Sequence, residues 1–146
     1  MVNLPTRTAT SAHYDRIKEF MRLARQDTPQ TPTMPSLAVR MLRAKLILEE
    51  AAETVRALGI DVLLEDPDSG RTHDVIDRLL KGSKQDTSDI PTYTESEEHA
   101  PNLVEIADGC ADVSVVTLGT LVSCGIRDVL LFAAIEQNNL DKFGPQ

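Results

Sequence analysis

Two clusters of acidic residues are the part of this sequence best suited to chemistry. The first cluster is Glu49, Glu50 and Glu53, in a segment with the apolar periodicity of an amphipathic helix. At about 100° per residue, these three carboxylates lie within about 100° of one another, on the same arc as Leu42 and Leu46. Carboxylates directed toward core leucines are costly to bury unless a positive charge lies between them. The pattern therefore favours a divalent cation with oxygen ligands.

The second cluster is Glu105, Asp108 and Asp112, whose spacing places them on a helical arc of about 60°. The rest of that segment, residues 103–122, is almost wholly apolar. Because a helix this apolar is expected to be buried, we expect its acids to be buried as well. We predict that two buried acidic stripes face each other across a metal ion. Three roles stay open for Asp112: an added ligand, a polar core contact, or a hydrogen-bond partner of a ligand.

A Glu-Glu-x-x-Glu segment opposite a Glu-x-x-Asp segment brings five carboxylates into one small volume. Mg²⁺ prefers octahedral oxygen coordination and keeps several waters, which suits carboxylates together with substrate phosphates. Such a site fits in-line attack of water on phosphorus, in which the metal neutralises phosphate oxygens and a base orients the water. Helical bundles also hold di-iron centres, but those use Glu-x-x-His. No histidine of this chain follows a glutamate at that spacing, which argues against a di-iron oxidase.

Length, charge and composition exclude several classes of protein. A chain of 146 residues is expected to form one domain. The formal net charge of −8 argues against a nucleic-acid partner, which requires a basic face. The longest uninterrupted apolar run is far too short to cross a membrane, and the polar N-terminus does not look like a signal peptide. We expect Cys110 and Cys124 to be reduced core residues, so the predicted location is the cytoplasm.

Four segments have the periodicity of helices, and two of them would position the acids. These segments are residues 12–25, 36–58, 103–122 and 128–142. Ser36 is well placed to cap the second helix, and Gly59 is well placed to end it. We predict an all-α fold, a helical bundle of four to five helices.

The region between the acidic helices is harder to assign. Residues 61–65, followed by a turn signal at residues 66–70, favour a small hairpin. Residues 75–81 have instead the pattern of a helical turn, and residues 82–101 are polar and predicted to be loop. We treat the chain as a single domain over residues 1–146, with residues 60–102 as a hairpin or loop insertion between the acidic helices.

Three stretches resemble the MazG-like all-α nucleoside triphosphate pyrophosphatases. They are Glu49-Glu50-Ala51-Ala52-Glu53, Glu105-Ile106-Ala107-Asp108 and Glu136-Gln137-Asn138-Asn139-Leu140-Asp141-Lys142. The resemblance covers residues 12–58 and 103–144 but not the region between them. This region is also a departure from the family, because the 51 residues between Glu53 and Glu105 are more than the usual spacer. The extra length is expected to serve as a lid, an oligomer contact or a specificity element.

The resemblance implies Mg²⁺-dependent hydrolysis of a (deoxy)nucleoside triphosphate between its α and β phosphates, with Mn²⁺ as a substitute metal. The products would be a nucleoside monophosphate and pyrophosphate. Matched residue by residue, the implied metal ligands are Glu50, Glu53, Glu105 and Asp108. Glu49 matches a glutamate that binds a second metal or orients the attacking water.

The same resemblance implies how substrate is bound and how the chain assembles. Lys142 and Asn139 match a phosphate-binding pair, and Arg43 is a weaker match to that role. The family implies a homodimer or homotetramer with active sites completed near the interface. The sequence supports an oligomer independently, because four short helices can hardly cover an apolar helix on all sides.

Other interpretations are compatible with the same residues. Glu49, Glu50 and Glu53 can form an exposed helix face, and Lys142 can simply complement a helix dipole. For the function, one rival is a phosphoribosyl-ATP pyrophosphohydrolase-like enzyme of the same superfamily, which the acidic motif alone does not separate. The other rival is a non-catalytic metal-binding helical assembly module.

Overall fold

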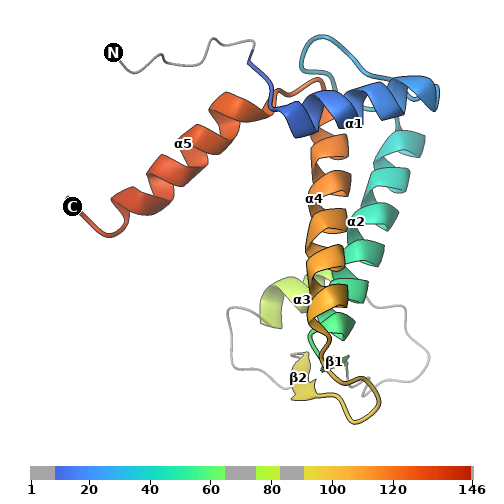
Figure 1. The fold of residues 1–146 in the computed structure, drawn as a ribbon, viewed down its shortest axis with the longest axis vertical. Coiled ribbons are helices and arrows are strands. Elements are labelled where there is room, and N and C mark those ends of the chain that lie inside the picture. Colours follow the sequence, from blue (N-terminus) through green and yellow to red (C-terminus); the bar gives the residue numbers. More distant parts are fainter. Residues whose placement is uncertain (1–8, 65–74, 83–90, 146) are drawn as a thin grey trace. The chain divides into compact units, whose positions relative to one another are not determined.

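The computed structural model describes residues 9–64, 75–82 and 91–145. In the described residues, helices predominate and the sheet has two short strands. The order is α1 (Ala12–Leu23), α2 (Leu37–Ala57), β1 (Ile60–Leu63), α3 (Val75–Gly82), β2 (Thr92–Glu95), α4 (Leu103–Ser123) and α5 (Asp128–Asp141) (Figure 1). The predicted all-α fold is confirmed.

Two compact units share the long helices α2 and α4. The first unit consists of Met1–Ala51 with Cys110–Gln146, and the second unit is Ala52–Gly109. The first unit therefore contains α1, α5 and the larger parts of α2 and α4. The second unit contains the last turns of α2, the two strands, α3 and the first turns of α4. The predicted insertion at residues 60–102 lies wholly within the second unit.

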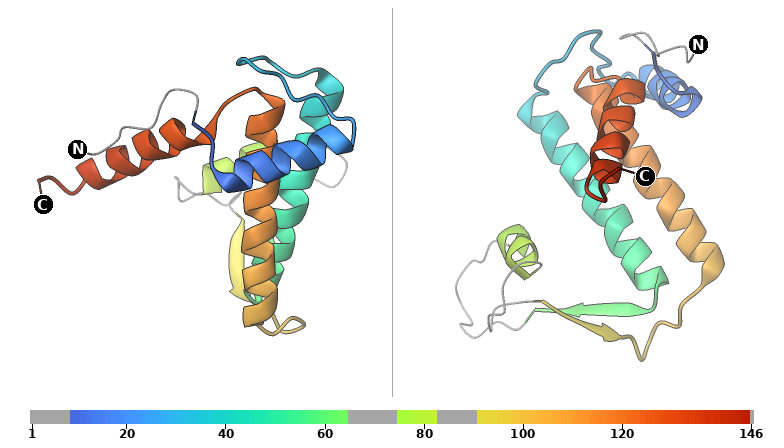
Figure 2. Two further views of the ribbon diagram at one scale, coloured as in Figure 1. Left: turned by 45° about the horizontal axis from the view of Figure 1, so that its top comes forward. Right: turned by 90° about the vertical axis from the view of Figure 1, so that its left-hand side faces the viewer.

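The core of the first unit lies between α1 and α4. The buried residues are Tyr14, Met21 and Val122, with Ile17, Leu118 and Leu121 packed against them. Positions 14, 17 and 21 are spaced by three and four residues, so α1 presents one apolar face. Helix α1 lies across α4, as the views in Figures 1 and 2 show. The first predicted helix is therefore confirmed, and it covers one side of α4.

A buried carboxylate joins the start of α1 to the start of α5. Asp128 is 4% exposed; its Oδ1 accepts the Ser11 N–H at 3.0 Å and its Oδ2 accepts the Ser11 hydroxyl at 2.5 Å. The Ser11 hydroxyl oxygen in turn accepts the Tyr14 N–H at 3.1 Å and so caps α1. Burial, and after it the charge of Asp128, raises the pKa of Tyr14 above its usual value.

Glycines on α4 let α2 approach closely in each unit. In the first unit, a Cβ on Gly119 would lie 2.5 Å from Nη1 of Arg43. In the second unit, a Cβ on Gly109 would lie 2.5 Å from Oγ1 of Thr54. Both glycines are buried, and the packed interior leaves no room for a larger side chain at either position. These contacts fix which residues of α2 and α4 lie opposite one another within each unit.

The two strands of the second unit pair antiparallel, with Ile60 opposite Glu95 at one end. Gly59 ends α2 as predicted, since it has a φ of 73° and its carbonyl oxygen accepts the Ser96 N–H at 2.7 Å. The helical turn predicted after residue 75 is confirmed as α3. Strand β2 lies in a region predicted to be loop, so that prediction is wrong. The turn signal at residues 66–70 lies outside the described residues.

Helix α4 is less covered than its composition predicts. Its buried residues are Gly109, Val116, Gly119, Val122 and Ser123. Although no uninterrupted apolar run is long enough, α4 has the length and composition of a membrane span, and only 17% of the 18-residue window that meets these criteria is buried. Core helices of soluble proteins meet the same criteria. The expectation of a wholly buried helix is wrong for one copy of the chain, because α1 and α2 leave part of its surface open.

Candidate metal and phosphate site

Helix α2 carries the first acidic cluster in its second half. Its start is fixed by Ser36, whose hydroxyl oxygen accepts the Val39 N–H at 3.3 Å, as the sequence predicts. Glu50 is half-buried, whereas Glu49 and Glu53 are exposed. The two exposed carboxylates are thus open to water and to cations from solution.

Helix α4 carries the second cluster in its first three turns. The side-chain oxygen of Asn102 caps this helix by accepting the N–H of Val104 at 2.9 Å and of Glu105 at 3.3 Å. Glu105 and Asp108 are exposed, and Asp112 is half-buried. The prediction that these acids are buried is therefore wrong for a single copy, because the described chain does not cover that side of α4. The same holds for the neighbouring Cys110, which is exposed although it was expected in the core.

Within each unit, the α2–α4 contact places acids at the same level on facing helices. In the first unit, Glu50 follows Arg43 by seven residues and Asp112 precedes Gly119 by seven. Seven residues are about two helical turns, so each acid shares a face with its contact residue. Because the helices run antiparallel (Figure 1), Glu50 and Asp112 lie opposite each other.

In the second unit, Glu53 directly precedes Thr54, and Asp108 directly precedes Gly109. Thr54 and Gly109 form the close contact described above, so these two acids flank that contact between α2 and α4. Glu105 lies one turn before Asp108 on the same helix. The second unit therefore has acidic residues on both of its long-helix segments.

The predicted ligands nevertheless do not form a closed metal site. Among residues 9–64, 75–82 and 91–145, no three acidic, histidine or cysteine side chains are close enough together to hold a metal ion. Carboxylates without a cation between them repel each other, which favours rotamers that turn them apart. The ligand set is divided, with Glu49 and Glu50 in the first unit and Glu53, Glu105 and Asp108 in the second. The metal site stays a prediction.

The predicted phosphate-binding pair lies at the end of α5. Lys142 Nζ donates a hydrogen bond to Asn139 Oδ1 at 2.9 Å, and both residues are exposed. Lys142 is the C-cap residue of α5, which also fits the dipole interpretation. Figures 1 and 2 show α5 extending away from the part of α2 that belongs to the same unit. The structure therefore brings Lys142 and Asn139 together, as the sequence resemblance implies for a phosphate-binding pair.

Arg43 has a buried guanidinium. It is 7% exposed, its Nη2 donates to Gln26 Oε1 at 2.8 Å, and its Nε has no hydrogen-bond partner among the described residues. Burial lowers the pKa of Arg43 below its usual value. These contacts hold the connector after α1 against α2 and α4, a role that the sequence pattern did not indicate. Its predicted role in phosphate binding stays a prediction.

The sequence that carries these acids and helices matches a known family. The sequence model of the family described as phosphoribosyl-ATP pyrophosphohydrolase matches residues 17–139, which include both acidic clusters and Asn139. A search of curated proteins found no match. This family is part of the MazG-like all-α superfamily, so the resemblance noted in the sequence is confirmed at that level. Its members are hydrolases that act on phosphoanhydride bonds. The chain belongs to the phosphoribosyl-ATP pyrophosphohydrolase family.

Proposed function

We propose that this chain hydrolyses a nucleotide between its α and β phosphates, and that phosphoribosyl-ATP is its first candidate substrate. The observation that carries the proposal is the family match over residues 17–139, which spans both acidic clusters. The products of this reaction would be phosphoribosyl-AMP and pyrophosphate. This reaction requires a metal, a residue that activates water and residues that hold the phosphates.

Mg²⁺ is the metal that suits this set of donors, with Mn²⁺ as a substitute. The proposed ligands are Glu50, Glu53, Glu105 and Asp108. Their carboxylate oxygens are the donors that Mg²⁺ prefers, and three of the four are exposed to solvent. When bound, the ion would neutralise negative charge on the substrate phosphates. Asp112 supports the same site, because it lies opposite Glu50 on α4 and is more buried than the other two acids of its cluster.

Glu49 is proposed to orient the attacking water and accept its proton. It neighbours Glu50 in the chain but points about 100° away around the helix, and it is exposed. A carboxylate at the edge of the ligand set can hold a water without being needed to hold the first metal. General-base catalysis of this kind contributes about 10²–10⁴-fold to the rate.

Lys142 and Asn139 are proposed to bind substrate phosphates, with Arg43 as a further candidate. The ammonium and the amide each supply hydrogen-bond donors to phosphate oxygens. The bond between Lys142 and Asn139 keeps the two side chains adjacent, so one phosphate group can contact both. Arg43 would reach a phosphate only after a rearrangement, because its guanidinium is buried.

The second candidate substrate is an ordinary (deoxy)nucleoside triphosphate. Lys142 favours it, since this residue belongs to the MazG-like resemblance and lies beyond the residues that the family model matches. Both candidate substrates carry the same triphosphate on the 5′ carbon of ribose. The choice between them therefore depends on the pocket around the base and not on the reaction.

The test is pyrophosphate release from a panel that contains phosphoribosyl-ATP, ATP and the deoxynucleoside triphosphates, each with Mg²⁺, Mn²⁺ or chelator. We expect pyrophosphate and a nucleoside monophosphate in equal amounts, only with metal, and fastest from phosphoribosyl-ATP. The Glu50→Gln variant serves as the control for contaminating phosphatases. A fastest rate with a deoxynucleoside triphosphate would select the second candidate. A folded parent protein that cleaves none of these compounds would leave the non-catalytic module as the function.

A further inference from the structure

Arg43 carries a buried positive charge that no neighbouring carboxylate balances. Its guanidinium is 7% exposed, its one hydrogen-bond partner among the described residues is the neutral side chain of Gln26, and its Nε has none. Burial is the cause of its lowered pKa, with no contribution from a neighbouring charge among the described residues. An arginine side chain nevertheless keeps its proton in a protein, so the charge remains. A buried charge without a counterion is costly, and a hydrophobic side chain of similar volume is often as stable or more stable. We therefore looked for a functional role of this charge.

Three elements of the first unit enclose the guanidinium of Arg43. On the side of α4, a Cβ added to Gly119 would lie 2.5 Å from its Nη1 and 3.6 Å from the sulfur of Met21, which belongs to α1. On the side of the connector after α1, Gln26 accepts the hydrogen bond from Nη2 at 2.8 Å. Each of these neighbours is uncharged. The guanidinium is thus held in place, while its positive charge is left uncompensated.

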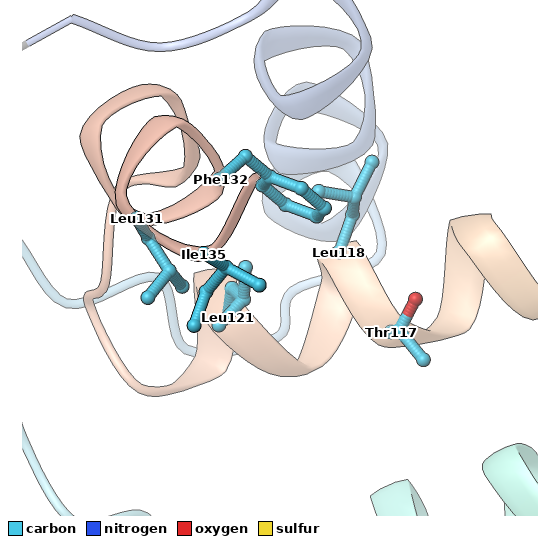
Figure 3. A pocket seen from close by; sticks show the side chains of 6 residues that line it. All are labelled: Thr117, Leu118, Leu121, Leu131, Phe132 and Ile135. Atoms are coloured by element: carbon cyan, nitrogen blue, oxygen red, sulfur yellow. The ribbon is translucent and has the colours of Figure 1, made fainter. Parts of the chain in front are cut away.

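The side of α4 that meets α5 offers no counterion to Arg43 either. Leu118 and Leu121 point at least about 100° away from Gly119 around α4, and they face α5 across a groove of about 380 Å³ (Figure 3). The side chains that line this groove are uncharged, and they are Thr117, Leu118, Leu121, Leu131, Phe132 and Ile135. The carboxylates nearest in register to Arg43 are therefore those on the facing sides of α2 and α4.

Arg43 lies on the same face of α2 as Glu50, about two turns or about 10 Å along the helix. Asp112 is related in the same way to Gly119, the residue that Arg43 contacts on α4. The positive charge and this pair of acids therefore share the side on which α2 and α4 face each other. Both acids are half-buried, and charges that are partly buried are screened by salt much less than exposed ones. The field of Arg43 is thus expected to reach a metal ion bound at Glu50.

A positive charge at this place acts in opposite directions on the two things that the site has to bind. It repels a free divalent cation, and so lowers the affinity of the acids for metal alone. It attracts a triphosphate with its bound metal, because that complex keeps a net negative charge. The same charge therefore weakens the binding of bare metal and strengthens the binding of metal together with nucleotide.

We propose that the buried charge of Arg43 lowers the affinity of the acidic site for free Mg²⁺, so that the ion is held firmly only together with the nucleotide. Arg43 acts here through its field and stays where it is, whereas direct contact with a phosphate would require its guanidinium to leave its buried position. For a divalent ion about 10 Å away, a dielectric constant of about 20 gives an upper bound of about 200-fold in affinity, and we expect at least about 10-fold. The inference rests on the metal site of the proposed function, but on no particular substrate.

The test is the binding of Mn²⁺ to nucleotide-free protein, measured by the electron paramagnetic resonance signal of the unbound ion. Arg43→Met and Arg43→Gln remove the charge and should each bind Mn²⁺ at least about 10-fold more tightly than the parent. Arg43→Lys keeps the charge and should stay within about twofold of the parent. The matched control is Arg40→Met on the same helix, which should also stay within about twofold, because Arg40 is exposed and screened by solvent. Thermal melts in chelator establish that each variant is folded.

A second titration uses Mn²⁺ bound to inorganic triphosphate, a probe that contains the part common to both candidate substrates. The two neutral variants should bind this complex more weakly than the parent, which is the opposite of their effect on free Mn²⁺. Neutral variants that bind free Mn²⁺ no more tightly than the parent, or an Arg43→Lys that behaves as they do, would overturn the proposal. Loss of folding in both neutral variants would overturn it too and identify Arg43 as structural. A parent that binds no Mn²⁺ would remove the metal site and this inference together, whereas a parent that binds Mn²⁺ but cleaves no nucleotide would remove only the proposed reaction.

Discussion

Helices α1 and α5 begin at the same contact between Ser11 and Asp128, yet among the described residues only α1 is well covered by the rest of the chain. Helix α1 buries Tyr14 and Met21 against α4, whereas Asp128 is the only buried residue of α5. This difference distinguishes residues that stabilise the first unit from residues that are predicted to do chemistry. Those around the Ser11–Asp128 contact hold the first unit together, whereas the acids and the Lys142–Asn139 pair predicted to do chemistry are exposed or half-buried. Substitutions at the Ser11–Asp128 contact should therefore lower stability, whereas substitutions of the acidic residues should lower turnover.

The largest expected effect is a loss of turnover when an acidic residue of α2 or α4 is substituted. Glu50→Gln and Asp108→Asn should each lower the metal-dependent rate by more than about 100-fold, because one proposed ligand is lost. Without metal, thermal stability should rise or stay level, since one charge is removed from a repelling group. The measurements are nucleotide turnover with Mg²⁺ and thermal melts in chelator. A large loss of stability in chelator would instead identify the residue as structural, and an unchanged rate would remove it from the site.

The four long helices could be predicted from the sequence because their signals are local. The periodicity of α1, the serine cap of α2 and the positive φ of Gly59 each depend on a few neighbouring residues. Strand β2 was missed because its partner β1 lies about thirty residues earlier, so its own polar residues do not reveal the pairing. Burial of α4 was overestimated, since periodicity shows that a face is apolar but not which molecule covers it.

The candidate site was predictable as a set of residues but not as a geometry. Acid spacing identified the two clusters, and the family match includes both. The placement of Asp112 opposite Glu50 could not be read from the sequence, because it depends on the contact between Arg43 and Gly119.

Glu49→Gln should give the next largest loss of turnover and leave the protein folded. If Glu49 orients the attacking water, kcat falls by about 10²–10⁴-fold while Mg²⁺ and nucleotide still bind. If Glu49 instead holds a second metal, the defect is partly rescued at high Mg²⁺ concentration. Single-turnover rates across a Mg²⁺ titration distinguish the two roles. A variant as fast as the parent at every Mg²⁺ concentration would exclude both.

Asp128→Ala tests whether the contact between Ser11 and Asp128 stabilises the first unit. It removes two hydrogen bonds from Ser11 and leaves a part-buried N–H without its acceptor, so we expect a loss of about 2–3 kcal/mol in the free energy of unfolding. The matched control is Asp141→Ala at the exposed far end of α5, which should change stability by less than about 0.5 kcal/mol. Urea melts of both variants measure the difference. Equal stabilities would show that the Ser11 contact does not hold the two helix starts.

The smallest expected effect is a pH dependence from Tyr14. Because burial raises its pKa, the unfolded chain loses this proton near pH 10 while the folded chain still keeps it. The stabilisation is thus complete below about pH 10 and is lost as the pH rises toward the raised pKa, by at most about 1.4 kcal/mol per unit of pKa difference. Tyr14→Phe should show a smaller loss of stability between pH 9 and 11, and Tyr93→Phe, at an exposed position, should behave as the parent does. Identical pH profiles for Tyr14→Phe and the parent would show that Tyr14 does not contribute.

Product analysis gives the most direct test of cleavage between the α and β phosphates at the acidic helices. Purified protein is incubated with Mg²⁺ and phosphoribosyl-ATP, and the products are separated and counted alongside those of Glu50→Gln. We expect one phosphoribosyl-AMP and one pyrophosphate per substrate consumed, and no turnover by the variant. Release of single phosphate with a diphosphate product, or equal turnover by the variant, would contradict it.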